Sequence, residues 1–270
     1  MVSVLAMAVW VVAQPVANLH EAGSLEAGVA SQVLYGTTVT EEKAQGDWLQ
    51  VRAEDGYPGW IRKAAVVRRE QPYGREGRVA RVDALAAHLY AEADVTKHAP
   101  VLTMPFETRL EVVAEPEDED RRWLQVRLVD GGLAWIQRGD VAASERPLGV
   151  SELVVFARRF LGLPYTWGGA SSFGYDCSGF TQMLCRRRGI TIPRDSRPQA
   201  AALKGIEPQE LAPGDLVFFG KAVDKVTHTG MYIGGGEFIH ATAWKYPRVQ
   251  VSRLDDPHWA ELLVGCRRPQ

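Results

Sequence analysis

Short runs of alternating apolar and polar residues fill the first half of the chain, which is the pattern of half-buried β-strands. The β-branched segment 9–12 (VWVV) leads directly into residues 16–19 (VANL), and together they predict the first strand of a small barrel. Turn signals at residues 54–56 (EDG) and 129–132 (VDGG) are flanked by apolar residues, as in β-hairpins. The first half is therefore expected to form small open β-barrels rather than a sandwich.

The same half of the chain contains an internal repeat. Residues 48–52 (WLQVR) recur at 123–127, and residues 59–61 (GWI) recur at 134–136 (AWI), both with an offset of 75 (123 − 48 and 134 − 59). Similarity at a fixed offset predicts two copies of one β-module.

Composition also marks the borders between these modules. Residues 67–80 (VRREQPYGREGRVA) and 143–149 (ASERPLG) have the glycine, proline and charge content of linkers. We therefore expect three domains, at residues 1–70, 71–145 and 150–270.

From residue 151 onward the apolar period becomes helical. Apolar residues of the segment 153–161 recur at helical spacing between Ser151, the expected N-cap, and Gly162. A second helix is predicted from Asp176 to Arg188, because an acid leads, three arginines trail and Gly189 follows.

The pattern becomes β again near the C-terminus, after a third short helix. That helix is expected to begin at Ser196, since residues 196–199 (SRPQ) have the form of a capping box. Segments 227–233 and 237–242 then flank three glycines at 234–236, which predicts a hairpin.

Cys177 occupies the first turn of the predicted second helix. The unpaired N–H groups of a first turn carry partial positive charge, and this charge favours a thiolate. The pKa of such a cysteine can fall well below its free value of about 8.5. Cys177 is therefore predicted to be a nucleophile.

Two histidines, His228 and His240, fall in the two strands of the predicted hairpin. If all three glycines form the loop, paired positions sum to 470, Gly230 faces His240, and both histidines share one face. A two-residue loop would shift the register by one and separate them. A single histidine in a strand is more often a core or edge residue, but two on one face, with a helix-terminal cysteine, are the parts of a thiol nucleophile with its base.

Composition and charge exclude several other functions. The fractions of hydrophobic (46%) and charged (24%) residues are those of a soluble globular protein, no membrane span is visible, and a net charge of −2 gives no basis for binding nucleic acid. Cys177 and Cys185 are eight positions apart (185 − 177) on one helix, hence roughly 12 Å, which is too far for a disulfide or a shared zinc ion. Cys185 and Cys266 are expected to be small buried residues, and no metal or other cofactor is expected.

Five blocks of the second half occur together in one order: residues 162–169 (GLPYTWGG), 176–180 (DCSGF), 213–219 (PGDLVFF), 228–234 (HTGMYIG) and 239–241 (IHA). Together they resemble the NlpC-type cell-wall cysteine peptidases. The resemblance implies a papain-like α+β domain that cleaves murein peptides at the γ-D-glutamyl–diamino acid bond. The WLxVR…DGxxGWI repeat resembles bacterial SH3-like domains. The expected fold is therefore α+β, with a papain-like NlpC-type catalytic domain preceded by two small SH3-like β-barrels.

The resemblance also implies roles for individual residues of the catalytic domain. Carried onto matching positions, Cys177 is the nucleophile, His228 the general base and His240 the polar residue that orients the base.

Four more residues, Tyr165, Asp176, Ser178 and Ser196, fall where the subgroup has substrate contacts. Each has a structural alternative: Asp176 and Ser196 as helix caps, Tyr165 as a packed aromatic residue, and Ser178 as an ordinary first-turn residue. For Asp176 the two roles are compatible.

Tandem SH3-like domains resemble the subgroup that acts on small peptides with a free N-terminal L-Ala. In that subgroup the first barrel closes one end of the site and supplies an acid and a tyrosine for the substrate amine. Tyr57 matches the tyrosine position, and Glu26 lies near the expected place of the acid. Glu21 lies in the same long first loop.

Three hypotheses follow. The first is a murein-peptide-recycling endopeptidase, the second an exported hydrolase or amidase whose barrels bind intact cell wall, and the third a catalytically idle binding protein. The third is disfavoured because the cysteine and both histidines are present. Residues 2–13 are apolar enough for a signal-peptide core, but no basic residue precedes them and no small-x-small cleavage site precedes Pro15. We therefore expect a cytoplasmic monomer acting on a murein-derived peptide, with export as the alternative.

Overall fold

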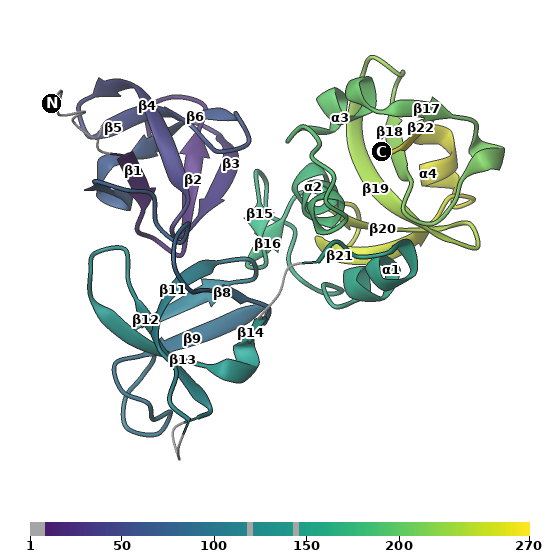
Figure 1. Ribbon diagram of the computed structural model, residues 1–270. Helices are drawn as coiled ribbons and strands as arrows, with labels where there is room; N and C mark the ends of the chain where they lie inside the picture. Colours follow the sequence, from purple (N-terminus) through teal and green to yellow (C-terminus); the bar gives the residue numbers. More distant parts are fainter. Residues whose placement is uncertain (1–8, 118–120, 143–145) are drawn as a thin grey trace, which may run out of the picture. The chain divides into compact units, whose positions relative to one another are not determined.

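The computed structural model describes residues 9–117, 121–142 and 146–270 of the protein. These residues form two compact units, the first ending at residue 142 and the second beginning at residue 146 (Figure 1). No helix within the described ranges is long and apolar enough to span a membrane.

The first unit consists of two seven-stranded antiparallel sheets with the same strand order. The order is β3-β2-β6-β5-β4-β1-β7 in the first sheet and β10-β9-β13-β12-β11-β8-β14 in the second, so each strand has a counterpart seven places later. The strands of the first sheet are β1 (Val9–Val12), β2 (Val16–His20), β3 (Val29–Leu34), β4 (Thr38–Gln45), β5 (Trp48–Arg52), β6 (Pro58–Arg62) and β7 (Val66–Arg69). Those of the second sheet are β8 (Val79–Val82), β9 (Ala86–Tyr90), β10 (Leu102–Pro105), β11 (Arg109–Ala114), β12 (Trp123–Arg127), β13 (Leu133–Gln137) and β14 (Val141–Ala142). The sequence repeat is thus a repeat of topology.

The predicted first strand is two strands. β1 pairs with β4 and β7, whereas β2 pairs with β3 and β6. Pro15, between them, has no N–H group to continue a ladder, so the chain turns there and crosses to the other part of the sheet. Residues 1–8, which the signal-peptide question also concerns, lie outside the described residues.

Buried tyrosines connect the two sheets. The hydroxyl of Tyr35 accepts a hydrogen bond from the N–H of Val129 at 2.6 Å, and the ring of Tyr73 lies edge-on to that of Tyr35 at 5.8 Å. Val11 of the first sheet and both tyrosines belong to the hydrophobic core of the second sheet. The two modules therefore share buried surface.

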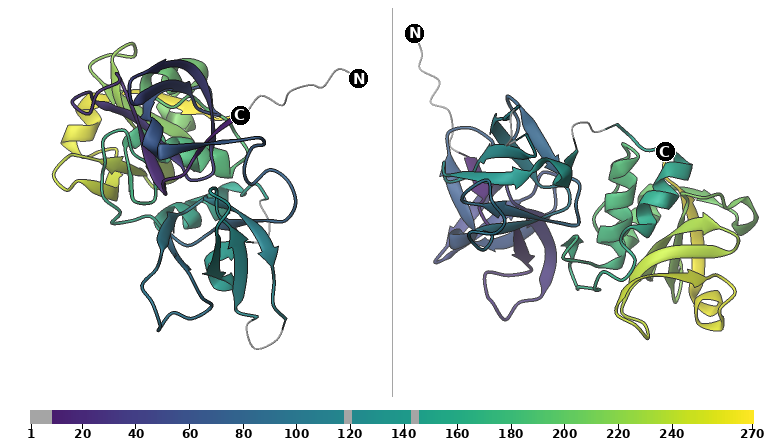
Figure 2. Two further views of the ribbon diagram at one scale, coloured as in Figure 1. Left: turned by 90° about the vertical axis from the view of Figure 1, so that its left-hand side faces the viewer. Right: turned by 90° about the horizontal axis from the view of Figure 1, so that it is seen from below.

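The second unit is an α+β domain built on one six-stranded antiparallel sheet. Its strand order is β17-β22-β18-β19-β20-β21. The strands are β17 (Lys204–Ile206), β18 (Leu216–Gly220), β19 (Val226–Gly234), β20 (Glu237–Thr242), β21 (Arg248–Arg253) and β22 (Leu263–Arg268), with a separate short pair, β15 (Ala170–Ser171) and β16 (Gly174–Tyr175). The helices are α1 (Val150–Arg158), α2 (Cys177–Arg187), α3 (Ser196–Ala202) and α4 (Pro257–Leu262). Helix α2 packs on β19 and β20, and α1 packs on α2 (Figure 2).

The helix predictions hold for α2 and need correction elsewhere. Helix α1 is capped by Gly149 rather than Ser151, because the Glu152 carboxylate accepts the Gly149 N–H at 3.0 Å, and it ends at residue 158. Asp195 occupies the N-cap position of α3 without a side-chain cap hydrogen bond, and Ser196 is the first helical residue. The Gln199 side chain points into the domain instead of completing a capping box.

Candidate active site

Cys177 is the first residue of α2, and Asp176 is the N-cap. The Asp176 carboxylate accepts the N–H of Gly179 at 2.7 Å, and the backbone N–H of Asp176 donates to the Gly169 carbonyl at 3.0 Å. A Cβ atom on Gly179 would lie 2.2 Å from that carbonyl oxygen, so only glycine fits there. The loop before the helix is thereby held close against the first turn.

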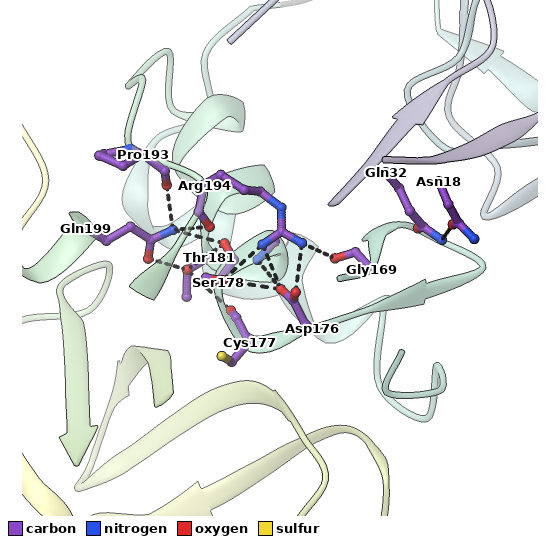
Figure 3. Close-up of polar contacts among 11 residues, drawn as sticks. Asn18, Gln32, Gly169, Asp176, Cys177, Ser178, Thr181, Pro193, Arg194 and Gln199 are labelled. Carbon is purple, nitrogen blue, oxygen red and sulfur yellow. Dashed lines mark hydrogen bonds and ion pairs between the residues drawn. The ribbon is translucent and has the colours of Figure 1, made fainter. Parts of the chain in front are cut away.

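A buried arginine neutralises the Asp176 carboxylate. Arg194 has a side chain only 1% exposed and donates in bidentate fashion, from Nη1 to Oδ1 at 3.0 Å and from Nη2 to Oδ2 at 2.7 Å (Figure 3). It also donates to the Ser178 hydroxyl at 3.0 Å and to the Gly169 carbonyl at 3.2 Å. We call Asp176, Ser178 and Arg194 the Asp176 cluster. Sequence reasoning missed Arg194, although a buried carboxylate usually requires a cationic partner.

Gln199 anchors the segment that carries Arg194. Its side chain is fully buried, and Nε2 donates to the carbonyls of Ser178 at 3.0 Å and Pro193 at 2.9 Å. The Thr181 hydroxyl donates to its Oε1 at 2.9 Å. The Asp176 cluster is therefore fixed to the start of α2, and Figure 3 shows the Cys177 sulfur pointing away from it.

The hairpin of β19 and β20 has the predicted register but a different loop. Met231 pairs with Ile239 and Tyr232 with Phe238, both summing to 470, whereas Gly234 pairs with Glu237 across a bulge. The loop therefore contains two glycines, not three. The bulge supplies the extra residue, so the register that places both histidines on one face is preserved.

His228 and His240 are in direct contact. His228 Nε2 and His240 Nδ1 are 2.7 Å apart, and His240 Nε2 is 3.0 Å from the Ser252 hydroxyl. The indole of Trp259, on α4, stacks on the His228 ring at 5.0 Å and meets the His240 ring edge-on at 4.9 Å. We call His228 and His240 the imidazole pair. Its prediction as same-face neighbours is confirmed.

Burial keeps the imidazole pair neutral near neutral pH. It lowers the pKa of His228 to about 3, with a smaller contribution from the charge of His258. Burial also lowers the pKa of His240, helped by the charge of His228. A neutral ring has a lone pair that can accept a proton.

The Cys177 sulfur contacts the strand that carries His228. Pairing of β19 with β20 ends at Met231 and Ile239, and beyond that point the backbone N–H of Thr229 donates to the sulfur. The sulfur is thus next to the residue that follows His228. A hydrogen bond between the sulfur and the His228 ring stays a prediction.

The pKa of Cys177 differs from the helix-terminal prediction. Burial, the largest cause, and the negative charge of Asp176 raise it to about 12, against the smaller lowering effects of the Thr229 and Ser178 N–H groups and of the Arg194 charge. The helix terminus alone predicted a lowered pKa, but the thiol is only 7% exposed, and loss of hydration outweighs the field of the first turn. Cys177 is therefore a thiol at neutral pH, and its proton has to leave during the attack.

The remaining predicted site residues lie in both units. Tyr165 is partly buried, and its pKa is raised by burial and by the charges of Cys177 and Asp176, which places its phenol near them. Ser196 starts α3, two residues after Arg194. In the first unit, Tyr57 packs on the sheet core, and Glu26 is exposed in the loop between β2 and β3.

Gly230 offers a test of the imidazole pair that alters no polar group. A Cβ at this position would lie 2.7 Å from Phe238 Cδ2 and 3.0 Å from His240 Cβ. Gly230→Ala should therefore displace His240 and lower kcat about tenfold or more, since misplaced catalytic groups cost that much. In the matched control, Gly205→Ala, the nearest atom is Arg267 Nη1 at 3.7 Å, and kcat should not change. Wild-type kcat in Gly230→Ala would show that the position of His240 does not matter.

Two family models match the chain: the NlpC/P60 family over residues 162–268 and the bacterial dipeptidyl-peptidase Sh3 domain over residues 19–66. The γ-D-glutamyl-L-lysine dipeptidyl-peptidase of Bacillus cereus (strain ATCC 10987 / NRS 248) is 34% identical over 254 residues, which are 88% of this chain and 74% of the relative. The protein of the same name from Bacillus subtilis (strain 168) is 32% identical, covering 89% of this chain and 81% of the relative. The crystal structure of an NlpC/P60 family protein from B. cereus ATCC 10987 superimposes with a TM-score of 0.84 at 27% identity, covering 96% of this chain and 99% of that one.

Proposed function

Because the chain belongs to the NlpC/P60 family, we propose that it is a cysteine endopeptidase that hydrolyses the γ-D-glutamyl–L-diamino acid bond of murein peptides bearing a free N-terminal L-Ala. Two observations support this most: the Cys177 thiol at a helix N-terminus accepts the N–H of Thr229, the residue after His228, and His228 is hydrogen-bonded to His240. These groups are a nucleophile, a base and a residue that orients the base.

The proposed reaction has two steps. In the first, the Cys177 thiol proton passes to His228 Nδ1, because Nε2 is engaged by His240. The sulfur bonds to the γ-carbonyl carbon of D-Glu, the C–N bond breaks, and His228 returns the proton to the leaving amine of the diamino acid. In the second step, His228 takes a proton from water as the water oxygen attacks the thioester. The C–S bond breaks, the proton returns to sulfur, and the dipeptide L-Ala-D-Glu is released with a free γ-carboxylate.

The Asp176 cluster and its neighbours are the proposed site for the γ-D-glutamyl part. We assign substrate contacts to Tyr165, Asp176, Ser178 and Ser196. Asp176 is also the N-cap of α2, so it would serve both as a cap and as a contact. Because Arg194 already binds both Asp176 and Ser178, these two side chains are oriented before a substrate arrives.

The first unit is proposed to complete the site. We assign SH3-like domains to residues 1–70 and 71–145, before a catalytic domain at 150–270; the identical strand orders of the two sheets support the second assignment. Tyr57, with Glu26 or Glu21, is proposed to bind the ammonium group of the substrate. An enzyme that requires a free N-terminal amine would act on murein fragments. It would not act on intact cell wall, where L-Ala is amide-linked to muramic acid. We therefore propose a cytoplasmic monomer that recycles murein peptides.

Acetylation of the substrate amine tests this assignment. Blocking the amine leaves a desolvated carboxylate unpaired, a loss of roughly 3 to 5 kcal/mol. N-acetyl-L-Ala-γ-D-Glu-L-Lys should therefore be cleaved at least about a hundredfold more slowly than the free peptide. Glu26→Gln and Glu21→Gln serve as a matched pair, because only the variant of the carboxylate that binds the amine should lose this discrimination.

Equal rates on both peptides, together with digestion of intact sacculi, would favour the alternative. The protein would then be an exported peptidoglycan hydrolase or amidase that binds cell wall through its SH3-like domains.

A further inference from the structure

A chain of hydrogen bonds continues beyond the imidazole pair. His228 Nε2 is 2.7 Å from His240 Nδ1, and His240 Nε2 is 3.0 Å from the Oγ of Ser252. Ser252 lies on β21, opposite Phe238 of β20. This register places its hydroxyl at the far end of the imidazole pair from His228. The last group of the chain is therefore a serine that the sequence patterns gave no reason to select.

Each hydrogen bond in this series determines which nitrogen carries the proton in the next hydrogen bond. A neutral imidazole has one N–H and one lone pair, so the contact between the two rings requires one nitrogen to donate and the other to accept. If His228 Nε2–H donates to His240 Nδ1, then His228 Nδ1 carries the lone pair and can take the thiol proton. If His240 Nδ1–H donates instead, His228 Nδ1 is already protonated and cannot act as a base.

We propose that Ser252 is a positioning residue whose hydroxyl oxygen accepts the Nε2–H of His240 and so selects the tautomer in which His228 can take the proton of Cys177. This inference rests on the proposed function, because it assigns a role in the same proton transfer. With His240 protonated at Nε2, its Nδ1 must accept, and His228 must donate from Nε2.

Two observations favour Ser252 as an acceptor. Ser252 is partly exposed, so its own O–H can donate to solvent while its oxygen accepts from His240. His240 is fully buried, so an Nε2–H without an acceptor would lose a hydrogen bond that water cannot replace. The same arrangement holds when His228 becomes a cation, since His228 Nε2–H still donates to His240 and His240 Nε2–H still donates to Ser252. Proton transfer then requires no reorganisation of the chain.

Kinetics of Ser252 variants test the role. Ser252→Ala should lower kcat about three- to tenfold, the effect of losing one hydrogen bond between neutral groups, and leave KM unchanged, because no substrate contact is removed. Ser252→Thr keeps the hydroxyl and should restore most of the activity. Gln250→Ala is the matched control, because Gln250 lies on the same strand and pairs directly with His240. It should keep wild-type kcat.

A double-mutant cycle separates this role from a general structural one. In a His240→Ala background, Ser252→Ala should cause no further loss, since the hydroxyl acts only through His240. A loss of equal size in both backgrounds, a change in KM alone, or wild-type kcat in Ser252→Ala would each overturn the proposal.

Imidazole ¹⁵N NMR spectra give a test that needs no turnover and therefore still reports if the proposed activity is absent. In the wild-type protein, His240 should be protonated at Nε2 and not at Nδ1, and Ser252→Ala should populate the other tautomer. Protonation of His240 at Nδ1 in the wild-type protein would overturn the proposal.

Discussion

Replacement of Cys177 by alanine or serine should abolish turnover, with kcat reduced on the order of 10⁴-fold or more. Alanine removes the attacking atom, and a serine hydroxyl is far harder to deprotonate than a thiol at the same place. Cys185→Ala and Cys266→Ala are matched controls, because both residues are buried cysteines of the same unit. Both variants should keep their turnover, measured as release of a free diamino acid.

Alkylation distinguishes the three thiols without mutation. Burial raises the pKa of all three, to about 12 for Cys177 and Cys185 and about 11 for Cys266, so acidity alone would favour Cys266. Exposure favours Cys177, which is 7% exposed against 3% and 1% for the others, and so does the proposed base His228. Iodoacetamide should therefore modify Cys177 first, and activity should fall in proportion. Near-normal turnover in Cys177→Ser would contradict the mechanism proposed above.

His228→Ala should lower kcat about 10³-fold, whereas His240→Ala should leave a measurable remnant, because orienting a base contributes less than supplying one. The pH profile gives a second readout. Neutral His228 is the active form, and burial lowers its pKa to about 3. The acid limb of kcat/KM should therefore lie well below pH 6.5, where a free histidine gains its proton.

These predictions are checked by measuring steady-state rates of the wild-type protein, His228→Ala and His240→Ala at pH values below and above 6.5. An acid limb near pH 6.5 in the wild-type protein would show that His228 is exposed to water during the reaction. Equal losses in the two variants would assign the proton transfer to the imidazole pair as a whole.

Local signals predicted the parts of the site that depend on local structure. The acid at the N-cap, the arginines of the last turn and Gly189 fixed the limits of α2, because helix ends are determined by neighbouring residues. The repeated tryptophan segments predicted the two modules because a repeated sequence forms a repeated structure. The shared face of the two histidines also followed from the strand pattern, although the loop length used to derive it was wrong and a bulge made up the difference.

Contacts made by distant segments were not predictable in this way. Arg194 reaches Asp176 across 18 positions, and no local pattern shows which carboxylate it will meet. Ser252 and Trp259 belong to β21 and α4, which the periodicity did not predict. Ser252 reaches His240 through the sheet register, and Trp259 reaches the histidines through the packing of α4. The prediction of a lowered pKa for Cys177 failed for the same reason, because burial by distant segments outweighs the field of its own helix.

Mass spectrometry of the products formed from free L-Ala-γ-D-Glu-L-Lys, with the wild-type and Cys177→Ala proteins side by side, tests the proposed activity most directly. A matching peptide with meso-diaminopimelic acid in place of lysine should be included, since the substrate contacts proposed above are on the glutamyl side. We expect L-Ala-D-Glu and the free diamino acid from the wild-type protein alone. Release of L-Ala with the γ-D-glutamyl bond intact, or the same products from Cys177→Ala, would contradict the assignment.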